Sequence, residues 1–146
     1  MKIGVVCYPT FGGSGVVATE LGIQMAKKGH EVHFITYSQP VRLDILEENI
    51  FYHEVNVHDY PLFEYQPYEL ALSSKMVDTV INEDLDILHV HYAIPHAYAA
   101  YMAKKILLDE HGKYLVDRPG VWFQVENHKL RGRHFQGMLP VAGRRV

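Results

Sequence analysis

The sequence predicts a doubly wound α/β fold, in which helices cover both faces of a parallel sheet. Short apolar runs alternate along the chain with longer segments whose apolar residues recur at helical spacing. The first run, Ile3–Cys7, contains no charged residue, as expected of a strand that is buried on both faces. In such sheets the crossovers are right-handed, and ligands lie beyond the carboxyl ends of the strands.

Three further strands follow from the hydrophobic pattern. Residues 31–38 (EVHFITYS) predict the second strand, and residues 49–57 (NIFYHEVNV) alternate in polarity and predict the third. Residues 86–92 (DILHVHY) predict the fourth. Because parallel strands end at one edge of a sheet, we expect the segments that follow them to meet on a common rim.

The helices are predicted from spacing and from their end signals. The first begins at Ser14 or Gly15 and ends at residues 27–29, where two lysines and a glycine match the preferences of a helix C-terminus. The second is predicted over residues 68–83. The third begins at Pro95 and runs through Leu108, because proline is favoured in the first turn of a helix.

Length and composition fit a single globular domain. The chain has 146 residues, 48% of them hydrophobic and 21% charged, with a net charge of −3. This charge gives no general reason to expect a nucleic acid or an anionic membrane as partner. No apolar run approaches the roughly 18 residues that span a bilayer, and the first residues do not form a signal peptide. With Cys7 as the single cysteine, we expect a cytoplasmic protein.

The composition changes near residue 117. Residues 1–116 contain eight Lys or Arg and fifteen Asp or Glu, whereas residues 117–146 contain six and two. The last six residues, VAGRRV, show neither helical nor strand periodicity. We therefore predict a domain over residues 1–116 and an atypical basic tail over residues 117–146. A foreign or disrupted end, an ordinary variable segment and a basic binding arm remain open as explanations.

A glycine-rich loop joins the first strand to the first helix. Gly12, Gly13 and Gly15 surround Ser14, and this much bare backbone allows a ligand to approach closely. The unpaired N–H groups and the positive dipole end of a helix N-terminus attract phosphate or carboxylate. The loop therefore indicates an anion-binding site, and a tight turn without a ligand is the alternative.

The same segment formally fits a dinucleotide fingerprint. Residues 13–18 (GSGVVA) match the pattern G-x-G-x-x-G/A. However, the second strand ends in Thr36-Tyr37-Ser38, where an acidic residue would bind the ribose. The pattern of a P-loop is absent from the sequence. An NAD-type dehydrogenase remains an alternative, as does a non-catalytic anion-binding module.

A second group of polar residues follows the fourth strand. The sequence HVHYAIPH places His89, His91, Tyr92 and His96 at its carboxyl end. His-x-His with no adjacent cysteine or carboxylate is weak evidence for a metal, so we predict none. The histidines are either satisfied in the core or lie on the rim, where Tyr92 would donate a hydrogen bond to substrate oxygens.

Three stretches together carry a resemblance to a known family. KIGVVCYPTFGGSGVVATELG, HEVHFITYSQPVRL and LDILHVHYAIPHAYAAYMAKK resemble the N-terminal half of a family-4 glycosyltransferase, over about residues 2–115. The resemblance implies paired Rossmann-like domains of the GT-B type, without a cofactor. It also implies a role in bacillithiol biosynthesis: retaining, metal-independent transfer of N-acetylglucosamine from UDP-N-acetylglucosamine to L-malate.

The resemblance also implies roles for individual residues. The loop over residues 12–15 would face the donor diphosphate and the acceptor. Ser14 and Tyr92 would each bind a carboxylate of malate, and Arg42 in PVRL would be a further contact. His91 and His96 would lie on the same rim.

Two departures from the family pattern alter the expected activity. The H-G-T-D motif that follows in the family is absent, and residues 115–135 (LVDRPGVWFQVENHKLRGRHF) stand in its place. The family's second domain, which binds most of the sugar nucleotide, has no counterpart in the sequence. We therefore expect a truncated transferase domain that is inactive by itself, and we assign no catalytic residue.

Overall fold

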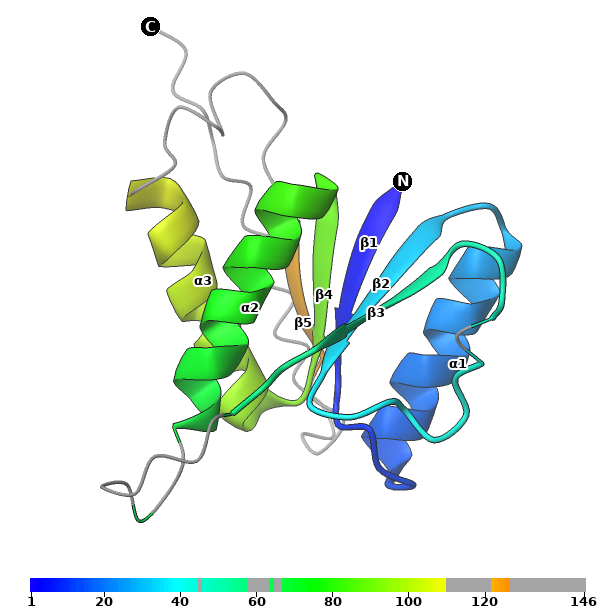
Figure 1. Ribbon diagram of the computed structural model, residues 1–146, viewed down its shortest axis with the longest axis horizontal. Helices are drawn as coiled ribbons and strands as arrows, with labels where there is room; N and C mark the ends of the chain where they lie inside the picture. Colours follow the sequence, from blue (N-terminus) through cyan, green and yellow to red (C-terminus); the bar gives the residue numbers. More distant parts are fainter. Residues whose placement is uncertain (45, 58–63, 65–66, 110–121, 127–146) are drawn as a thin grey trace, which may run out of the picture.

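A computed structural model describes residues 1–44, 46–57, 64, 67–109 and 122–126 of the chain. The described strands form a five-stranded parallel sheet in the order β3-β2-β1-β4-β5 (Figure 1). The elements in chain order are β1 (Lys2–Val6), α1 (Gly13–Lys27), β2 (Glu31–Thr36), β3 (Ile50–Glu54), α2 (Tyr68–Glu83), β4 (Ile87–His91), η1 (Ala93–Ala97), α3 (Tyr98–Asp109) and β5 (Trp122–Glu126).

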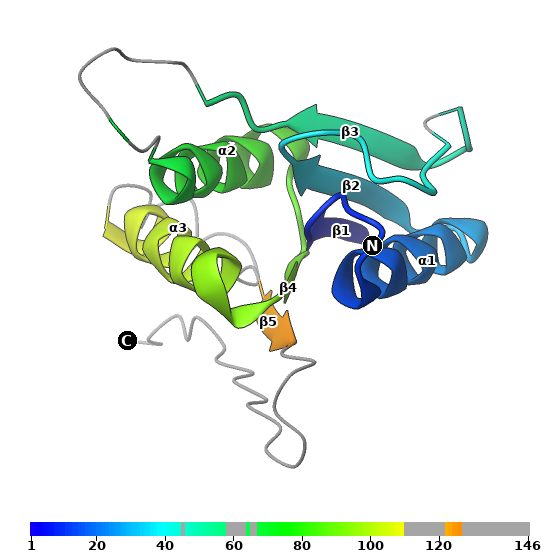
Figure 2. The same cartoon turned by 90° about the horizontal axis from the view of Figure 1, so that it is seen from below.

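The helices cover both faces of the sheet, as the sequence predicts. Figure 2 shows α1 on one side of the strands and α2 with α3 on the other. Each face has its own core: Val32 and Phe34 of β2 pack with residues of α1, whereas Ile35 packs with residues of α2 and α3. The side chains of successive strand residues therefore point into the cores on opposite faces of the sheet. This is why apolar residues run continuously in the central strands. The predicted doubly wound α/β class is confirmed.

The last long helix begins where the sequence predicts it. Within the π-helical segment Ala93–Ala97 only Ile94 has non-helical angles, so helical backbone starts at Pro95 and α3 continues it from Tyr98. Ile94 inside this segment is extended, with φ −126° and ψ 122°. A residue that precedes proline is disfavoured in the α region, and this explains why the helical backbone starts at Pro95 and not before it.

A strand lies within the segment that we predict to be an atypical tail. Residues Trp122–Glu126 run parallel to β4, with Ile87 opposite Trp122 and His91 opposite Glu126. No strand is predicted at this position from the sequence. The remainder of residues 117–146 lies outside the described residues, and the boundary at residue 117 stays a prediction.

The chain reverses its direction of winding between β1 and β4. β1 pairs with β2 on one side and with β4 on the other, so the segments after β1 and β4 lead to helices on opposite faces. In open α/β sheets, ligands bind in the crevice at this switch point. None of the described helices is both long enough and apolar enough to cross a membrane.

Close packing of α1 on β2 depends on a glycine. A Cβ built at Gly22 would overlap the ring of Phe34, and that ring is fully buried in the core beneath α1. The ring has no room to move away because protein interiors are closely packed. Gly22 therefore sets how near the helix lies to the sheet.

We expect Gly22→Ala to destabilise the protein by about 1–3 kcal/mol, the usual cost of overpacking a core. Gly13→Ala on the same helix is the matched control, since a Cβ there has no neighbour within 4 Å. Urea unfolding followed by circular dichroism measures both variants. Equal stability of the two would show that α1 can shift on the sheet without cost.

Candidate functional site

A pocket lies at the switch point, between the segments that follow β1 and β4. Its volume is about 570 Å³, and its lining residues come from the loop after β1, the start of α1 and the residue after β4. These residues are Tyr8, Thr10, Gly12, Gly13, Ser14, Val17 and Tyr92. The structure thus brings together the glycine loop and Tyr92, which are about 80 residues apart in sequence.

The N-terminus of α1 forms one wall of the pocket. The carbonyl oxygen of Gly12 accepts hydrogen bonds from the N–H groups of Gly15 and Val16, at 3.1 and 3.2 Å. The first turn contains no acidic residue, and the N-cap residue is Gly12, which has no side chain to cap the helix. The positive end of the helix dipole therefore faces the pocket without an acidic residue in its own first turn, a setting that suits phosphate or carboxylate.

The glycines of the loop have different structural roles. A Cβ at Gly15 would overlap the carbonyl oxygen of Tyr8 and lie 2.9 Å from that of Thr10, so Gly15 allows α1 to pack on the preceding loop. Among the described residues, a Cβ at Gly13 would meet no atom within 4 Å, and one at Gly12 would make only an ordinary contact with Thr10. The open space needed for a ligand lies at Gly13, whereas Gly15 is required for packing.

Tyr92 occupies an unusual backbone conformation at the pocket wall. Its φ is +85°, a region that side chains with a Cβ rarely adopt, at a cost of about 1–3 kcal/mol. Its ring meets that of Tyr8 edge to face, with centroids 5.4 Å apart. Backbone strain of this kind is concentrated at functional sites, where the surrounding structure holds it in place.

A neutral histidine lies behind the pocket wall. His96 is fully buried, and its ring contacts that of Tyr8 at a centroid distance of 4.3 Å. Its Nδ1 donates to the carbonyl oxygen of His91 at 2.8 Å, and Tyr68 Oη lies 3.4 Å from its Nε2. Burial lowers the pKa of His96 and raises the pKa values of Tyr8 and Tyr68, so all three are neutral near pH 7.

Besides Gly15, three of the residues predicted for the site do not line the pocket. His91 and His96 are fully buried, so the structure places them below the rim. Arg42 lies at the surface, where its Nη1 is 3.0 Å from Oε1 of Glu20 on α1. A contact between any of these three residues and a substrate stays a prediction.

Sequence reasoning missed three of the lining residues, Tyr8, Thr10 and Val17. Tyr8 and Thr10 directly follow β1, so the rule that ligands lie beyond strand ends could have found them. Cys7 precedes them, but it is buried, and burial raises the pKa of its thiol to about 12. The protonated thiol is no nucleophile.

The end of β2 shows none of the features of a dinucleotide site. Residues 37–43, which follow β2, contain no acidic side chain, and Thr36 Oγ1 donates to the carbonyl oxygen of Ser38. Glu31 lies at the opposite end of the same strand and pairs with Lys2 at 3.0 Å. The described residues therefore offer no acidic partner for a ribose at the position that dinucleotide-binding folds use.

The fold and the pocket define a Rossmann-like domain with a pocket at the switch point of its sheet. The model of Glycosyltransferase Family 4 matches residues 11–138, and the chain belongs to this family. Over 107 residues, the chain is 59% identical to the N-acetyl-alpha-D-glucosaminyl L-malate synthase of Bacillus anthracis. The match covers 73% of this chain and 28% of that protein.

Solved structures of glycosyltransferases share the fold. A glycosyltransferase from Rickettsia africae ESF-5 superposes with a TM-score of 0.51 at 17% identity, over 84% of this chain and 36% of the other. The sucrose-phosphate synthase of Thermosynechococcus elongatus superposes with a TM-score of 0.50 at 16% identity, over 88% and 33%. At this level of identity the likeness shows the fold alone, and it confirms the expected Rossmann-like arrangement.

The buried His96 predicts a loss of stability in mild acid. Its pKa is lowered from the ordinary value of 6.5 in the folded state, so the unfolded chain takes up a proton first as the pH falls. The contribution of His96 to the free energy of unfolding is complete above pH 6.5, the pKa of histidine in the unfolded chain. It is lost as the pH falls toward the lower pKa of the folded state. We expect the decrease in unfolding free energy between pH 7.5 and 5.5 to be smaller in His96→Gln, measured by urea unfolding.

His30→Gln, in the turn after α1, is the control for this experiment. It should keep the pH dependence of the wild-type protein. An unchanged pH dependence in His96→Gln would mean that His96 titrates normally in the folded state.

Proposed function

We propose that this chain supplies the acceptor-binding domain of a retaining glycosyltransferase. In the proposed reaction, N-acetylglucosamine passes from UDP-N-acetylglucosamine to the hydroxyl group of L-malate. The observation that carries the proposal is the pocket that the glycine loop and Tyr92 form together at the switch point. The 59% identity to the L-malate synthase of Bacillus anthracis supports this choice of substrates.

The pocket has groups that suit a small dicarboxylate. The positive end of α1 and the hydroxyl group of Ser14 would bind one carboxylate, and the phenol of Tyr92 would donate to the other. Hydrogen bonds to a charged partner contribute roughly 1.5–3 kcal/mol each. Two such contacts at opposite walls would orient malate with its hydroxyl group toward the donor sugar.

The diphosphate of the donor would bind to the same glycine loop. The N–H groups around Gly12 and Gly13 are suited to stabilise charge on the leaving UDP, in the manner of an oxyanion hole. The chain spans 28% of the length of its curated relative, so we propose transfer for a longer protein that contains this domain. The 146-residue chain by itself is proposed to bind malate without turnover, and without a metal or a cofactor. We place it in the cytoplasm, where a free buried thiol such as Cys7 is common.

Calorimetric titration of the 146-residue chain tests the proposal. We expect heat of binding with L-malate, weaker binding with succinate, which lacks the hydroxyl group, and none with NADH. Mass spectrometry of a mixture with UDP-N-acetylglucosamine and L-malate should show no glycosylated malate. Binding of NADH would support the dehydrogenase alternative, and absence of malate binding would contradict the acceptor assignment.

A larger side chain at position 13 should abolish anion binding and leave the fold intact. A side chain there would meet no protein atom within 4 Å of its Cβ, so Gly13→Val fills only the space that the ligand needs. We expect the affinity for malate to fall by about tenfold or more, equivalent to about 1.4 kcal/mol, with an unchanged circular dichroism spectrum. Val17→Ala, at another lining residue, removes bulk and should bind malate at least as well as the wild type. Wild-type affinity in Gly13→Val would show that the loop is only a turn.

Tyr92→Phe separates a binding role from a structural role. The change removes one hydrogen-bond donor and little volume, so we expect malate affinity to fall by about tenfold or more while the thermal midpoint stays nearly constant. Tyr8→Phe is the matched control, because it removes a phenol from the same aromatic pair. A lowered midpoint with unchanged malate affinity in Tyr92→Phe would mean that the phenol serves the fold.

A further inference from the structure

A pair of histidines lies between β2 and β3, on the side of the sheet that α2 covers. His33 Nδ1 is 2.9 Å from His53 Nε2, although the residues belong to different strands. Glu83, the last residue of α2, offers a carboxylate oxygen, and the three ligand atoms lie within 4.8 Å of one another. Three groups that bind transition metals thus converge from three elements.

A carboxylate fixes the orientation of the buried histidine. His33 Nε2 lies 3.0 Å from Oε1 of Glu31, and Lys2 Nζ lies 3.0 Å from the same oxygen. The carboxylate accepts from Nε2–H of His33, and Nδ1 of the same ring faces His53. The ring also stacks on Phe51, with centroids 4.9 Å apart.

From this geometry we propose that His33, His53 and Glu83 bind one Zn²⁺ ion. Zinc binds histidine nitrogen at about 2.0–2.1 Å, so two nitrogens on one ion lie about 2.9–3.4 Å apart for angles between 90° and the tetrahedral angle. The separation of 2.9 Å between the two nitrogens falls in this range. The ion would lie beside the line that joins the two nitrogens, so the rings have to turn their lone pairs toward it and the proton between them leaves to solvent. Glu31 acts as the outer partner that orients a metal-binding histidine.

The burial of the three ligands fits a site that an ion can enter. His33 is fully buried and held on both sides, whereas His53 and Glu83 are partly exposed. The long side chain of Glu83 has the freedom to close the coordination, and water completes the remaining position. The exposed side gives the ion its path from solvent.

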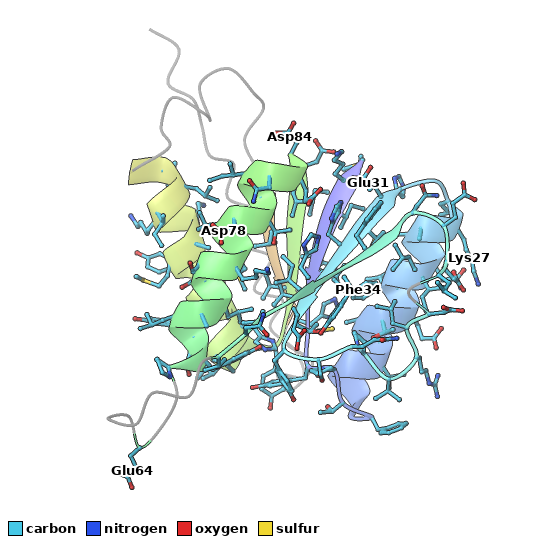
Figure 3. All side chains as sticks on the ribbon, viewed as in Figure 1. Lys27, Glu31, Phe34, Glu64, Asp78 and Asp84 are labelled. Carbon is cyan, nitrogen blue, oxygen red and sulfur yellow. The ribbon has the colours of Figure 1, made fainter. Side chains whose placement is uncertain are left out.

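The proposed zinc site lies on the face of the sheet that α2 covers and shares no residue with the candidate pocket, because His33 and His53 lie within β2 and β3. Glu31 begins β2 and Glu83 ends α2, whereas the pocket lies beyond the carboxyl ends of the strands. Figure 3 shows the labelled Glu31 and Asp84, the neighbour of Glu83, at the same edge. The ion would join β3, which is the outer strand beside β2, to β2 and α2, so its role is structural and independent of acceptor binding.

Zinc titration of the metal-stripped 146-residue chain, in competition with a chromophoric chelator, tests the proposal. We expect His53→Gln to bind one equivalent of Zn²⁺ fewer than the wild type. Glu31→Gln should keep the site but weaken it by about 10–100-fold, the usual effect of losing an outer carboxylate. His30→Gln is the control for the histidine and should bind as the wild type does, even though the chain has ten histidines.

A second measurement separates metal binding from folding. The thermal midpoint of the wild type should rise with Zn²⁺ concentration, because an ion that binds only the folded state stabilises it. Glu83→Gln should lose most of this rise, whereas Glu69→Gln, in the first turn of the same helix, should retain it. Equal zinc stoichiometry in the wild type and His53→Gln, or an equal rise in both glutamate variants, would overturn the proposal.

Discussion

The parallel pairing of β1 with β4 is the constraint on which the rest of the structure depends. Ile3 lies opposite Ile87 and Val6 opposite Val90, although more than 80 residues separate the strands in sequence. Because β1 also pairs with β2, the chain must wind in opposite directions from the centre of the sheet. The loops that follow β1 and β4 then diverge, and a pocket opens between them.

Close backbone packing holds this pocket in shape. Gly15 allows the start of α1 to lie against the carbonyl groups of the preceding loop, and Gly22 allows the middle of the helix to lie on Phe34. Both contacts fix the helix axis, so the free N–H groups at its start point to a defined place. The strained backbone of Tyr92 is held opposite them by its contact with Tyr8.

Two regions of the sheet carry different chemistry. The carboxyl edge has a pocket with hydroxyl groups and a positive helix end, which suits an organic anion. The face under α2 has the cluster of His33, His53 and Glu83, which we propose for a metal ion. The two sites share no residue, so ligand binding at one and metal binding at the other can be changed separately.

The sequence by itself determined the elements whose signal is local. The period of apolar residues identified α2 with the observed bounds Tyr68–Glu83, and the glycine loop marked the start of α1 correctly to within two residues. The family was also recognisable, because three ordered motifs carry it. These features depend on neighbours within a few turns or a single strand.

Only the tertiary structure decided which distant residues meet. Strand pairing brings Tyr8 into contact with Tyr92 and His33 into contact with His53. The spacing of apolar residues within a strand does not predict which strand it pairs with, or in which register. For the same reason β5 was not predicted from the sequence, because its position depends on pairing with the free edge of β4. The different roles of Gly13 and Gly15 were equally invisible in sequence, because they depend on which backbone atoms surround each residue after folding.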